Sequence, residues 1–437
     1  QVLSWPIQML WQKSLDTSDI PQTMKHAVIF PLAKGGCLTS PSNYRPISLT
    51  SHVVKIFERV MKGRIVNFLE KNKWFNSKQH GFRSKRSTLT QLLEHYDKIT
   101  NALCDGSNVD VIYLDFAKAF DKVDHSILLS KLHNAGIQGN VYKWIKTFLK
   151  GRTQSVVVNG ETSAPVEVLS GVPQGTVLGP LLFLVMANDL SKNCPHTYVS
   201  CFADDTRVLG IVKDARDVEN VQADLKEIFK WAGENNMQFN ESKFELLRYG
   251  KNSDLKAGSS YHCSNDAAIE EKDSLRDLGV QMQNNALFDE QIAKVEASGR
   301  RLCSWALRTF LARDKITMLT LWKQLIQPVM DYCSPLWIPH KRKDLDRLEA
   351  VQRSFTSKIT EVKELDYYDR LNDLRLYSIQ RRFERFMIIN VWKILEGYTV
   401  NVNEKIVVQV TMRNQARIGR MCDYKVDRKS TRLNSSH

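Results

Sequence analysis

The chain lacks the patterns typical of membrane-spanning, secreted and zinc-binding proteins. It has no uninterrupted apolar run of about 18 residues, so no transmembrane helix is predicted. Its first residues show no basic start followed by an apolar core, as a signal peptide would. Its eight cysteines are scattered without a Cys-x-x-Cys pair, so we expect them to be reduced and structural. These absences predict an intracellular protein of the nucleus or cytoplasm that does not bind a membrane.

Negative charge is also in short supply. The chain has 62 Lys and Arg against 48 Asp and Glu, which gives a formal net charge of +14. Such a surplus favours a polyanionic partner. With 437 residues, of which 43% are hydrophobic, the chain can build a large core that we expect to be divided into roughly two or three subdomains.

Three acids are the most informative residues present. Asp115 lies near the end of Val109 to Phe116, a β-branched and aromatic run that predicts a buried strand. Asp204 and Asp205 form the tip of a predicted hairpin that spans Tyr198 to Val212. If the strand and the hairpin are neighbours, the carboxylates converge and raise one another's pKa unless cations neutralise them. Mg²⁺ prefers carboxylates, waters and phosphates as ligands, and two such ions clamp an in-line phosphoryl displacement.

An Asp-Asp pair alone is more often ordinary turn chemistry than a catalytic feature. The context here favours a site, because a Gly- and Pro-rich turn, Ser170 to Pro180, lies between the two acidic segments and opens onto the apolar run Leu181 to Ala187. Glycine in such a turn allows the backbone to approach a ligand closely.

Several separated motifs resemble, in the family's order, those of the reverse transcriptases of non-LTR retrotransposons, in particular jockey-like mobile elements. One such match could arise by chance, but a full ordered set could not plausibly do so. The resemblance spans roughly Ile20 to Gly397. The motifs are Asn43 to Leu49 and Gln79 to Arg83 for the fingers, Asp115 to Asp121 for the first catalytic block, Gly171 to Gly175 for the nucleotide pocket, Phe202 to Asp205 for the acidic hairpin, Met237 to Asn240 with Lys243 for the next palm block, and Asp277 to Val280 for the primer grip.

The resemblance implies an α+β, right-hand polymerase fold with fingers, a palm of antiparallel sheet backed by helices, and a helical thumb. We expect the fingers and lead-in at 1–108, the palm at 109–283, and the thumb with a C-terminal extension at 284–426. Residues 427–437 read like a translated sequencing adapter and are excluded from fold reasoning. An upstream endonuclease domain is expected in the intact element but is absent from this sequence.

The resemblance also implies a metal site. Asp115, Asp204 and Asp205, with the carbonyl oxygen of Phe116, would hold two Mg²⁺ ions, and Mn²⁺ could replace them. Lys243 would be the fourth catalytic residue and would protonate the pyrophosphate leaving group. The alternative for Lys243 is an ordinary exposed lysine.

The same resemblance places residues around the incoming nucleotide. Phe120, five residues after Asp115, would exclude ribonucleotides by a steric clash with the 2′ hydroxyl, unless it is simply a core residue. Gln174 and Gly175 would line the nucleotide pocket. Arg45, and more weakly Lys34, would bind the triphosphate, because such cations match phosphate oxygens. Either could instead be a solvated surface charge.

Helical patterns account for much of the remaining chain. A fingers helix is predicted over Ser51 to Lys71, with its apolar stripe in the core, and a strand is expected at Leu278-Gly279. Beyond Asn284 the pattern is helical, and from Arg300 to Val400 there are 19 Lys and Arg against 12 Asp and Glu, as suits a surface along a nucleic-acid backbone. The predicted core residues are Val53, Val54, Phe57, Val60, Met61, Ile65, Phe68 and Leu69 of the fingers helix, and Trp305, Trp322, Trp337 and Trp392 of the thumb.

The predicted function is RNA-directed DNA polymerisation, with an RNA template, a DNA primer and dNTPs as partners. One alternative is an inactive or repurposed retroelement remnant that only binds nucleic acid. Another is a two-metal nuclease, which would share the acids but would not need the pocket Gly171 to Gly175.

Overall fold

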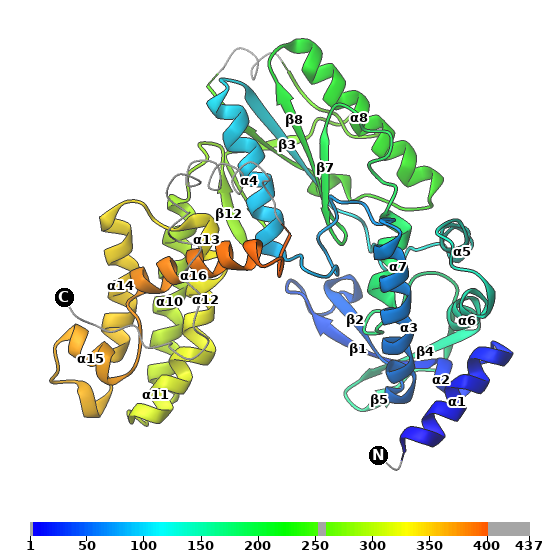
Figure 1. The fold of residues 1–437 in the computed structure, drawn as a ribbon, viewed down its shortest axis with the longest axis horizontal. Coiled ribbons are helices and arrows are strands. Elements are labelled where there is room, and N and C mark those ends of the chain that lie inside the picture. The colour runs from blue at the N-terminus through cyan, green and yellow to red at the C-terminus, as the bar shows by residue number, and fades with distance from the viewer. Residues whose placement is uncertain (1–2, 252–258, 401–437) are drawn as a thin grey trace, which may run out of the picture. The chain divides into compact units, whose positions relative to one another are not determined.

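The computed structural model describes residues 3–251 and 259–400 (Figure 1). By its internal contacts the chain forms two compact units, Gln1–Gln91 with Ile99–Phe288 and Leu92–Lys98 with Asp289–His437. The end of the expected C-terminal extension and the tail at 427–437 lie outside the described residues. Helices and sheets are both extensive, which confirms the predicted α+β class.

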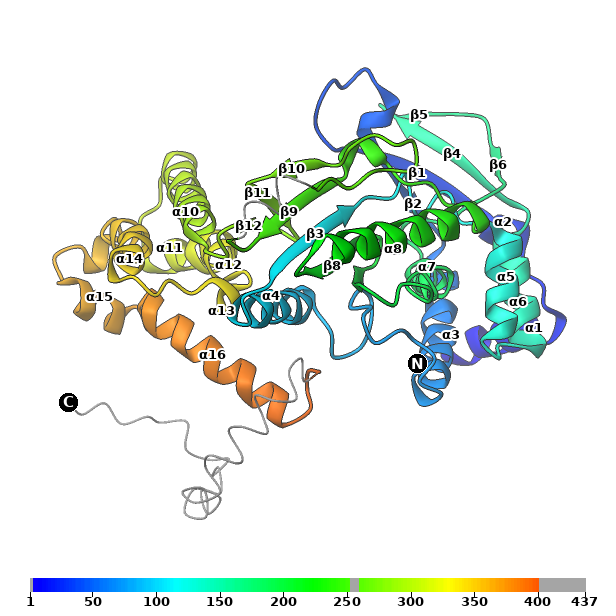
Figure 2. The same ribbon diagram turned by 90° about the horizontal axis from the view of Figure 1, so that it is seen from above.

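A five-stranded sheet, here called the palm sheet, occupies the centre of the first unit. Its strand order is β10-β9-β3-β8-β7, and neighbours are antiparallel except for the parallel pair β9 and β10. Helix α8 (Ala215–Glu234) lies against β8 (Figure 2) and buries Val221, Leu225 and Ile228 in the main core. The strands are β3 (Asn108–Leu114), β7 (Tyr198–Phe202), β8 (Asp205–Val212), β9 (Glu245–Tyr249) and β10 (Glu270–Lys272).

A second sheet of the first unit has the order β2-β1-β4-β5, with β6 also paired to β4. Strand β1 pairs antiparallel with β2 and parallel with β4, so segments far apart in the chain form one surface. The strands are β1 (His26–Ala33), β2 (Tyr44–Leu49), β4 (Arg152–Val158), β5 (Glu161–Thr162) and β6 (Val166–Val168). The accompanying helices are α1 (Ser4–Thr17), α2 (Gln22–Lys25), η1 (Pro41–Asn43), α3 (His52–Lys71), α5 (His125–Asn134), α6 (Gly139–Leu149), α7 (Gly179–Ala187) and η2 (Glu241–Lys243), while α4 (Thr88–Cys104) has residues in both units.

The predicted fingers helix is present as α3, but part of its expected core stripe is wrong. Val60 is 57% exposed and Phe68 is 42% exposed. The buried face consists of Val54, Phe57, Met61, Ile65 and Leu69, whose spacing follows one side of the helix. Phe68 lies beside this face. Its ring approaches Gly136 so closely that a Cβ added to that glycine would lie 3.1 Å from Cζ of Phe68.

The expected strand at Leu278-Gly279 is also wrong, because these residues form a turn. They connect β11 (Ser274–Asp277) to β12 (Val280–Gln283), which pair antiparallel. The φ angles of Leu278 and Gly279 are 43° and 92°. Two successive positive φ angles in a two-residue loop match the twist of a hairpin, and this accounts for the glycine.

The second unit is helical. Its longest helix, α10 (Asp289–Thr309), packs against α12 and α14, and α16 packs against α13 and α14. Trp322 and Trp337 are each 1% exposed and form its core with Phe355 and Phe383. The other elements are α11 (Lys315–Leu321), the π-helical turn η3 (Trp322–Ile326), α12 (Gln327–Asp331), α13 (Ser334–Trp337), α14 (Arg342–Thr356), η4 (Thr360–Val362), α15 (Tyr367–Asp373) and α16 (Ile379–Leu395).

Two tryptophans predicted to lie in the core are exposed instead. Trp305 is 44% exposed and contacts Phe310, and Trp392 is 47% exposed and contacts Tyr398. Each ring therefore packs on a neighbour in its own segment. Within residues 3–251 and 259–400, no helix is long and apolar enough to cross a bilayer, and the seven described cysteines form no disulfide.

Candidate active site

The three predicted acids meet at one end of the palm sheet. Asp115 follows β3, whereas Asp204 and Asp205 lie where β7 turns into β8. Strands β3 and β8 pair with Leu114 opposite Thr206, so the register itself places Asp115 next to the acidic turn. A cavity of about 560 Å³ opens here, lined by Asp115, Asp205 and Lys243 together with the β11–β12 turn.

The backbone beyond β3 is held by the segment that precedes η2. The carbonyl of Asp115 accepts a hydrogen bond from the N–H of Asn240 at 2.7 Å, and the N–H of Ala117 donates to the carbonyl of Gln238 at 2.8 Å. Between these bonds, the ring of Phe116 stacks on Phe239 with centroids 4.2 Å apart. Phe116 is thus anchored by its buried side chain, which leaves its main chain at the edge of the site.

Burial and the charges of neighbouring acids raise the pKa values of Asp204 and Asp205. Burial, followed by the charge of Asp205, raises the pKa of Asp204 to about 6, while Arg45 acts in the opposite direction. The pKa of Asp205 is also raised, mainly because surrounding protein displaces water and to a lesser degree because of the charge of Asp115. The Arg207 guanidinium opposes this shift, and Asp205 itself keeps some exposure to solvent. Excess negative charge therefore collects at this end of the sheet, as the sequence predicted.

Lys243 supplies part of the missing positive charge. Its Nζ lies 2.9 Å from Oδ2 of Asp115, although the lysine side chain is 64% exposed. Lys243 ends η2, and its N–H donates to the carbonyl of Asn240, the residue that also binds the Asp115 backbone. One short segment thus positions both the acid and its cationic neighbour.

Asp115, Asp204 and Asp205 carry carboxylate oxygens, the donor atoms that Mg²⁺ and Mn²⁺ prefer. In the part of the chain that the structure describes, no group of three or more His, Cys, Asp or Glu side chains, these three acids included, lies close enough together to hold a metal ion as it stands. The observation that fits a divalent cation is the raised pKa of Asp204, to which the charges of Asp205 and Asp115 contribute after burial, because a cation beside these carboxylates would remove the repulsion.

The Gly171–Gly175 turn packs closely on β2 and on the segment after β3. The carbonyl of Gln174 accepts from the N–H of Ser48 at 2.8 Å, and its side-chain amide donates to Asp121 at 3.1 Å. Gly175 has a φ of 103°, and a Cβ there would lie 2.6 Å from the carbonyl oxygen of Ser48. Glycine is therefore required by both conformation and space.

Phe120 contacts both the core and the Gly171–Gly175 turn, here called the pocket turn. Its ring is half-buried, stacks on Phe183 with centroids 4.7 Å apart and meets Phe82 edge-on at 6.4 Å. Its carbonyl accepts from the N–H of Val172 in the pocket turn at 2.8 Å. Phe120 thus packs against the core through its ring and binds the Gly171–Gly175 turn through its carbonyl.

The two predicted triphosphate ligands are both exposed. Arg45 lies on β2 opposite Leu32 of β1, and its charge lowers the pKa of Asp204, so its electrostatic influence reaches the acids. Lys34 follows β1, where its N–H donates to the carbonyl of Asn43 at 2.8 Å.

The sequence predicted no role at the site for three buried polar residues that lie near it. Arg207 of β8 is 1% exposed and pairs with Asp277 of β11, and Glu58 of α3 accepts from the N–H groups of Val177 and Leu178. The third is Gln79, which binds the backbone of Ala203. The available signal for Arg207 was a charged residue at the start of an apolar run, and for Glu58 it was an acid on the apolar face of the predicted helix.

Comparison with known proteins gives consistent matches. Residues 32–282 match the family described as reverse transcriptase (RNA-dependent DNA polymerase). The chain is 26% identical over 366 residues to the RNA-directed DNA polymerase from mobile element jockey of Drosophila melanogaster, a match that covers 81% of this chain and 40% of the relative. It is 26% identical over 329 residues to the probable RNA-directed DNA polymerase from transposon X-element of the same species, covering 73% of this chain and 36% of the relative. The chain thus spans two fifths or less of the length of these two relatives.

Among solved structures, apo telomerase from Candida tropicalis is similar, with a TM-score of 0.48 at 10% sequence identity. That match covers 98% of this chain and 73% of the telomerase chain.

Proposed function

Because this chain belongs to the reverse transcriptase family, as its motifs predicted, we propose that it is an RNA-directed DNA polymerase of a non-LTR retrotransposon. It would add dNTPs to the 3′ hydroxyl of a DNA primer paired with an RNA template. The observation that carries the proposal is the convergence of Asp115 with Asp204 and Asp205 beside a cavity of about 560 Å³, with the pKa of Asp204 raised to about 6.

In this proposal Asp115, Asp204, Asp205 and the Phe116 carbonyl would hold two Mg²⁺ ions, or Mn²⁺ in their place. When bound, such ions activate the attacking hydroxyl and neutralise charge on the triphosphate. The chain's own contribution is to bring the carboxylates together through the register of β3 and β8. Lys243, with its Nζ beside Asp115, would donate a proton to the departing pyrophosphate.

Residues of the pocket turn and fingers would place the nucleotide. Arg45 and Lys34 would bind phosphate oxygens, and Gln174 and Gly175 would contact the base or sugar through a turn already packed on β2. Phe120 would exclude the 2′ hydroxyl. The close packing of the Gly171–Gly175 turn on β2 favours a polymerase over a two-metal nuclease, which needs the acids but not the turn.

We also propose that residues 1–108 are the fingers, 109–283 the palm and 284–426 a helical thumb with its extension. The proposal is supported by the palm sheet, whose strands fall between Asn108 and Lys272, and by the unit boundary between Phe288 and Asp289.

Primer extension on an RNA template tests the function. Asp204→Asn should lower the rate by at least roughly 10²–10³-fold, the scale of losing one strong electrostatic contact to a transition state. Binding of the primer–template should change far less. The control is Glu219→Gln, an exposed acid of α8 that lies outside the site and should extend primers normally.

An Asp204→Asn protein that extends primers within a few-fold of the parent would contradict the assignment of the acids. Cutting of the template strand without dNTP addition would support the nuclease alternative. Binding of the primer–template with neither reaction in the parent protein would support the remnant that only binds nucleic acid.

A further inference from the structure

Gln79 binds both backbone groups of the residue that precedes Asp204. Its Oε1 accepts a hydrogen bond from the N–H of Ala203 at 3.0 Å and one from the N–H of Gly81 at 2.8 Å. Its Nε2 donates to the carbonyl of Ala203 at 3.3 Å. Gln79 is only 6% exposed, so these bonds form where water cannot readily replace them.

The main chain around Gln79 also continues the palm sheet beside β7. The N–H of His80 donates to the carbonyl of Cys201 at 2.9 Å, and the N–H of Cys201 donates to the carbonyl of Lys78 at 3.0 Å. Gly81 then meets the turn directly, because a Cβ there would lie 2.3 Å from the nitrogen of Ala203. The fingers loop and the acidic turn are therefore in backbone-to-backbone contact.

Ala203 has a conformation that alanine does not favour. Phe202 pairs with Asp205, so Ala203 and Asp204 form a two-residue hairpin loop. The φ of Ala203 is 56°, whereas Asp204 is not among the residues with positive φ. A positive φ at the first loop position alone is the pattern of a type II′ turn, which prefers glycine there. An external contact must therefore offset the strain at Ala203.

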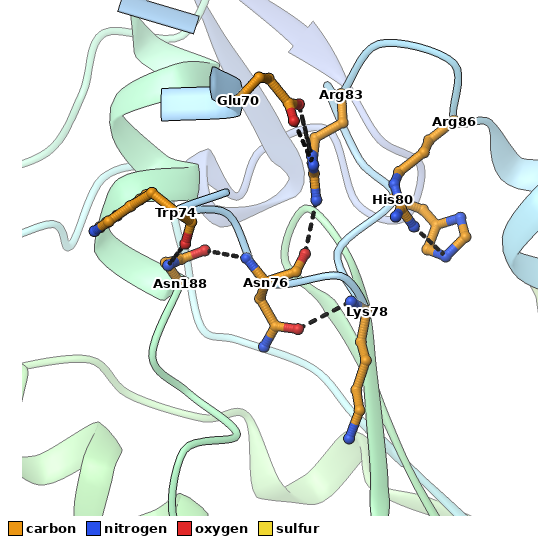
Figure 3. Close-up of polar contacts among 8 residues, drawn as sticks. All are labelled: Glu70, Trp74, Asn76, Lys78, His80, Arg83, Arg86 and Asn188. Atoms are coloured by element: carbon orange, nitrogen blue, oxygen red, sulfur yellow. Dashed lines mark hydrogen bonds and ion pairs between the residues drawn. The ribbon is translucent and has the colours of Figure 1, made fainter. Parts of the chain in front are cut away.

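The loop that carries Gln79 is itself firmly anchored (Figure 3). Arg83 forms paired hydrogen bonds with Glu70 of α3 and donates to the carbonyl of Asn76 at 2.7 Å. The N–H of Asn76 donates to the side chain of Asn188, just after α7, at 2.8 Å, and the N–H of Lys78 donates to the side chain of Asn76 at 2.9 Å. Gln79 is thus held in place by contacts to two helical segments before it reaches Ala203.

We propose that Gln79 is a positioning residue that keeps Ala203 in its strained conformation and so aims Asp204 and Asp205 into the site. The proposal rests on the polymerase function proposed above. Without Gln79, alanine at this position would favour a negative φ by roughly tenfold, and the competent turn would become a minor population. Glycine has nearly equal access to both signs of φ, so a glycine at 203 would need Gln79 much less.

This reasoning predicts a specific rescue. Gln79→Met keeps the side-chain volume but loses all three hydrogen bonds, and it should lower kcat for primer extension by roughly tenfold, with a much smaller change in KM for dNTP. Adding Ala203→Gly should bring kcat back to within roughly threefold of Ala203→Gly alone. Gln138→Met, at an exposed glutamine before α6, is the matched control and should extend primers normally.

Hydrogen exchange across residues 198–210 tests the same proposal without activity. In Gln79→Met the Ala203 amide should exchange faster, while the exchange of α8 stays close to that of the parent. Gln79→Glu retains an acceptor for the Ala203 and Gly81 N–H groups, so it should keep most of the protection at Ala203. It provides this test even if Gln79→Met does not fold.

The proposal is overturned if Gln79→Met leaves kcat unchanged, if Ala203→Gly fails to rescue it, or if Gln79→Glu loses Ala203 protection as fully as Gln79→Met. A parent protein that extends no primer would instead refute the polymerase function, and the exchange result would still decide whether Gln79 holds the turn.

Discussion

The carboxyl group of Asp204 destabilises the folded protein by an amount that depends on pH. Its pKa is raised from 3.8 to about 6, first by burial and then by the charge of Asp205. A carboxyl group whose pKa is higher in the folded state binds protons more tightly there than in the unfolded chain. Its contribution to stability therefore falls as the pH rises from about 4 to about 6, and the full penalty persists at higher pH.

Asp204→Asn should consequently stabilise the protein at neutral pH in EDTA. We expect the melting temperature at pH 7.5 to rise by roughly 2–4 °C, the effect of about 1 kcal/mol once solvent screening of a half-buried group is allowed for. The gain should shrink as the pH falls toward 4, where the parent carboxyl is protonated. Thermal unfolding monitored by fluorescence at several pH values measures this, and a pH-independent gain would argue against the charge as its cause.

Phe120 has a dual position that a conservative truncation can resolve. Phe120→Val removes the ring that is proposed to exclude the 2′ hydroxyl, so it should raise the ratio of ribonucleotide to deoxyribonucleotide incorporation. Some stability will be lost as well, because the ring also stacks on Phe183. Single-nucleotide extension with matched rNTP and dNTP measures the ratio. An unchanged ratio in an active variant would leave Phe120 as a core residue only.

At the scale of elements, a buried ion pair joins β8 to the β11–β12 hairpin. Nε of Arg207 lies 2.8 Å from Oδ1 of Asp277, and the two side chains are 1% and 3% exposed. Burial raises the pKa of Asp277, and the Arg207 guanidinium opposes that shift. Because the β11–β12 turn lines the cavity beside Asp205, this pair also fixes one wall of the site.

Breaking one half of this pair should cost more than removing both halves. Asp277→Leu leaves the Arg207 charge buried without its carboxylate, and we expect it to lower the free energy of unfolding by about 3–5 kcal/mol. The double variant Arg207→Met with Asp277→Leu should recover most of that loss. Urea unfolding of the single and double variants measures the coupling, and purely additive losses would mean that the pair contributes little.

At the scale of the whole molecule, the net charge of +14 is only partly available to a polyanion. In the second unit several cations are already paired, including Arg347 with Glu296 and Arg382 with Asp331. Lys341 and Arg342 also have acidic neighbours: Nζ of Lys341 lies 3.5 Å from Asp289, and Nε of Arg342 lies 3.0 Å from Asp346. The number of phosphate contacts should therefore be smaller than the count of Lys and Arg suggests.

Binding to a primer–template should still weaken steeply with salt. Each phosphate contact contributes a slope of about −0.7 to −0.9 in log K against log salt, since bound cations release counterions. Fluorescence anisotropy of a labelled primer–template over a range of salt concentrations measures the total slope. Repeating the titration with a second monovalent salt that has a different anion controls for effects of one particular anion. A nearly flat dependence would place the charge surplus away from the binding surface.

The sequence by itself determined the elements whose signal is local. The strand β3, the acidic hairpin and the helix α3 were predicted within a few residues, because a run of β-branched residues or a 3.6-residue period depends only on neighbours in the chain. The order of the motifs was enough to predict the family. Local patterns could not show that Phe68 or Trp392 is exposed, because burial depends on which other segment covers each face of a helix.

Only the tertiary structure decided how the site is held. Arg207 and Asp277 are 70 residues apart in the chain, and Gln79 and Ala203 are 124 apart, so no periodicity links the partners. In the sequence, Ala203 is an ordinary alanine, and Gln79, which binds its backbone, is one glutamine in a motif. Gln79 and Ala203 meet only because folding brings the loop at Gln79 alongside β7. Hydrogen bonds to the Ala203 backbone depend on where that backbone lies and not on its side chain, so the sequence alone could not reveal them.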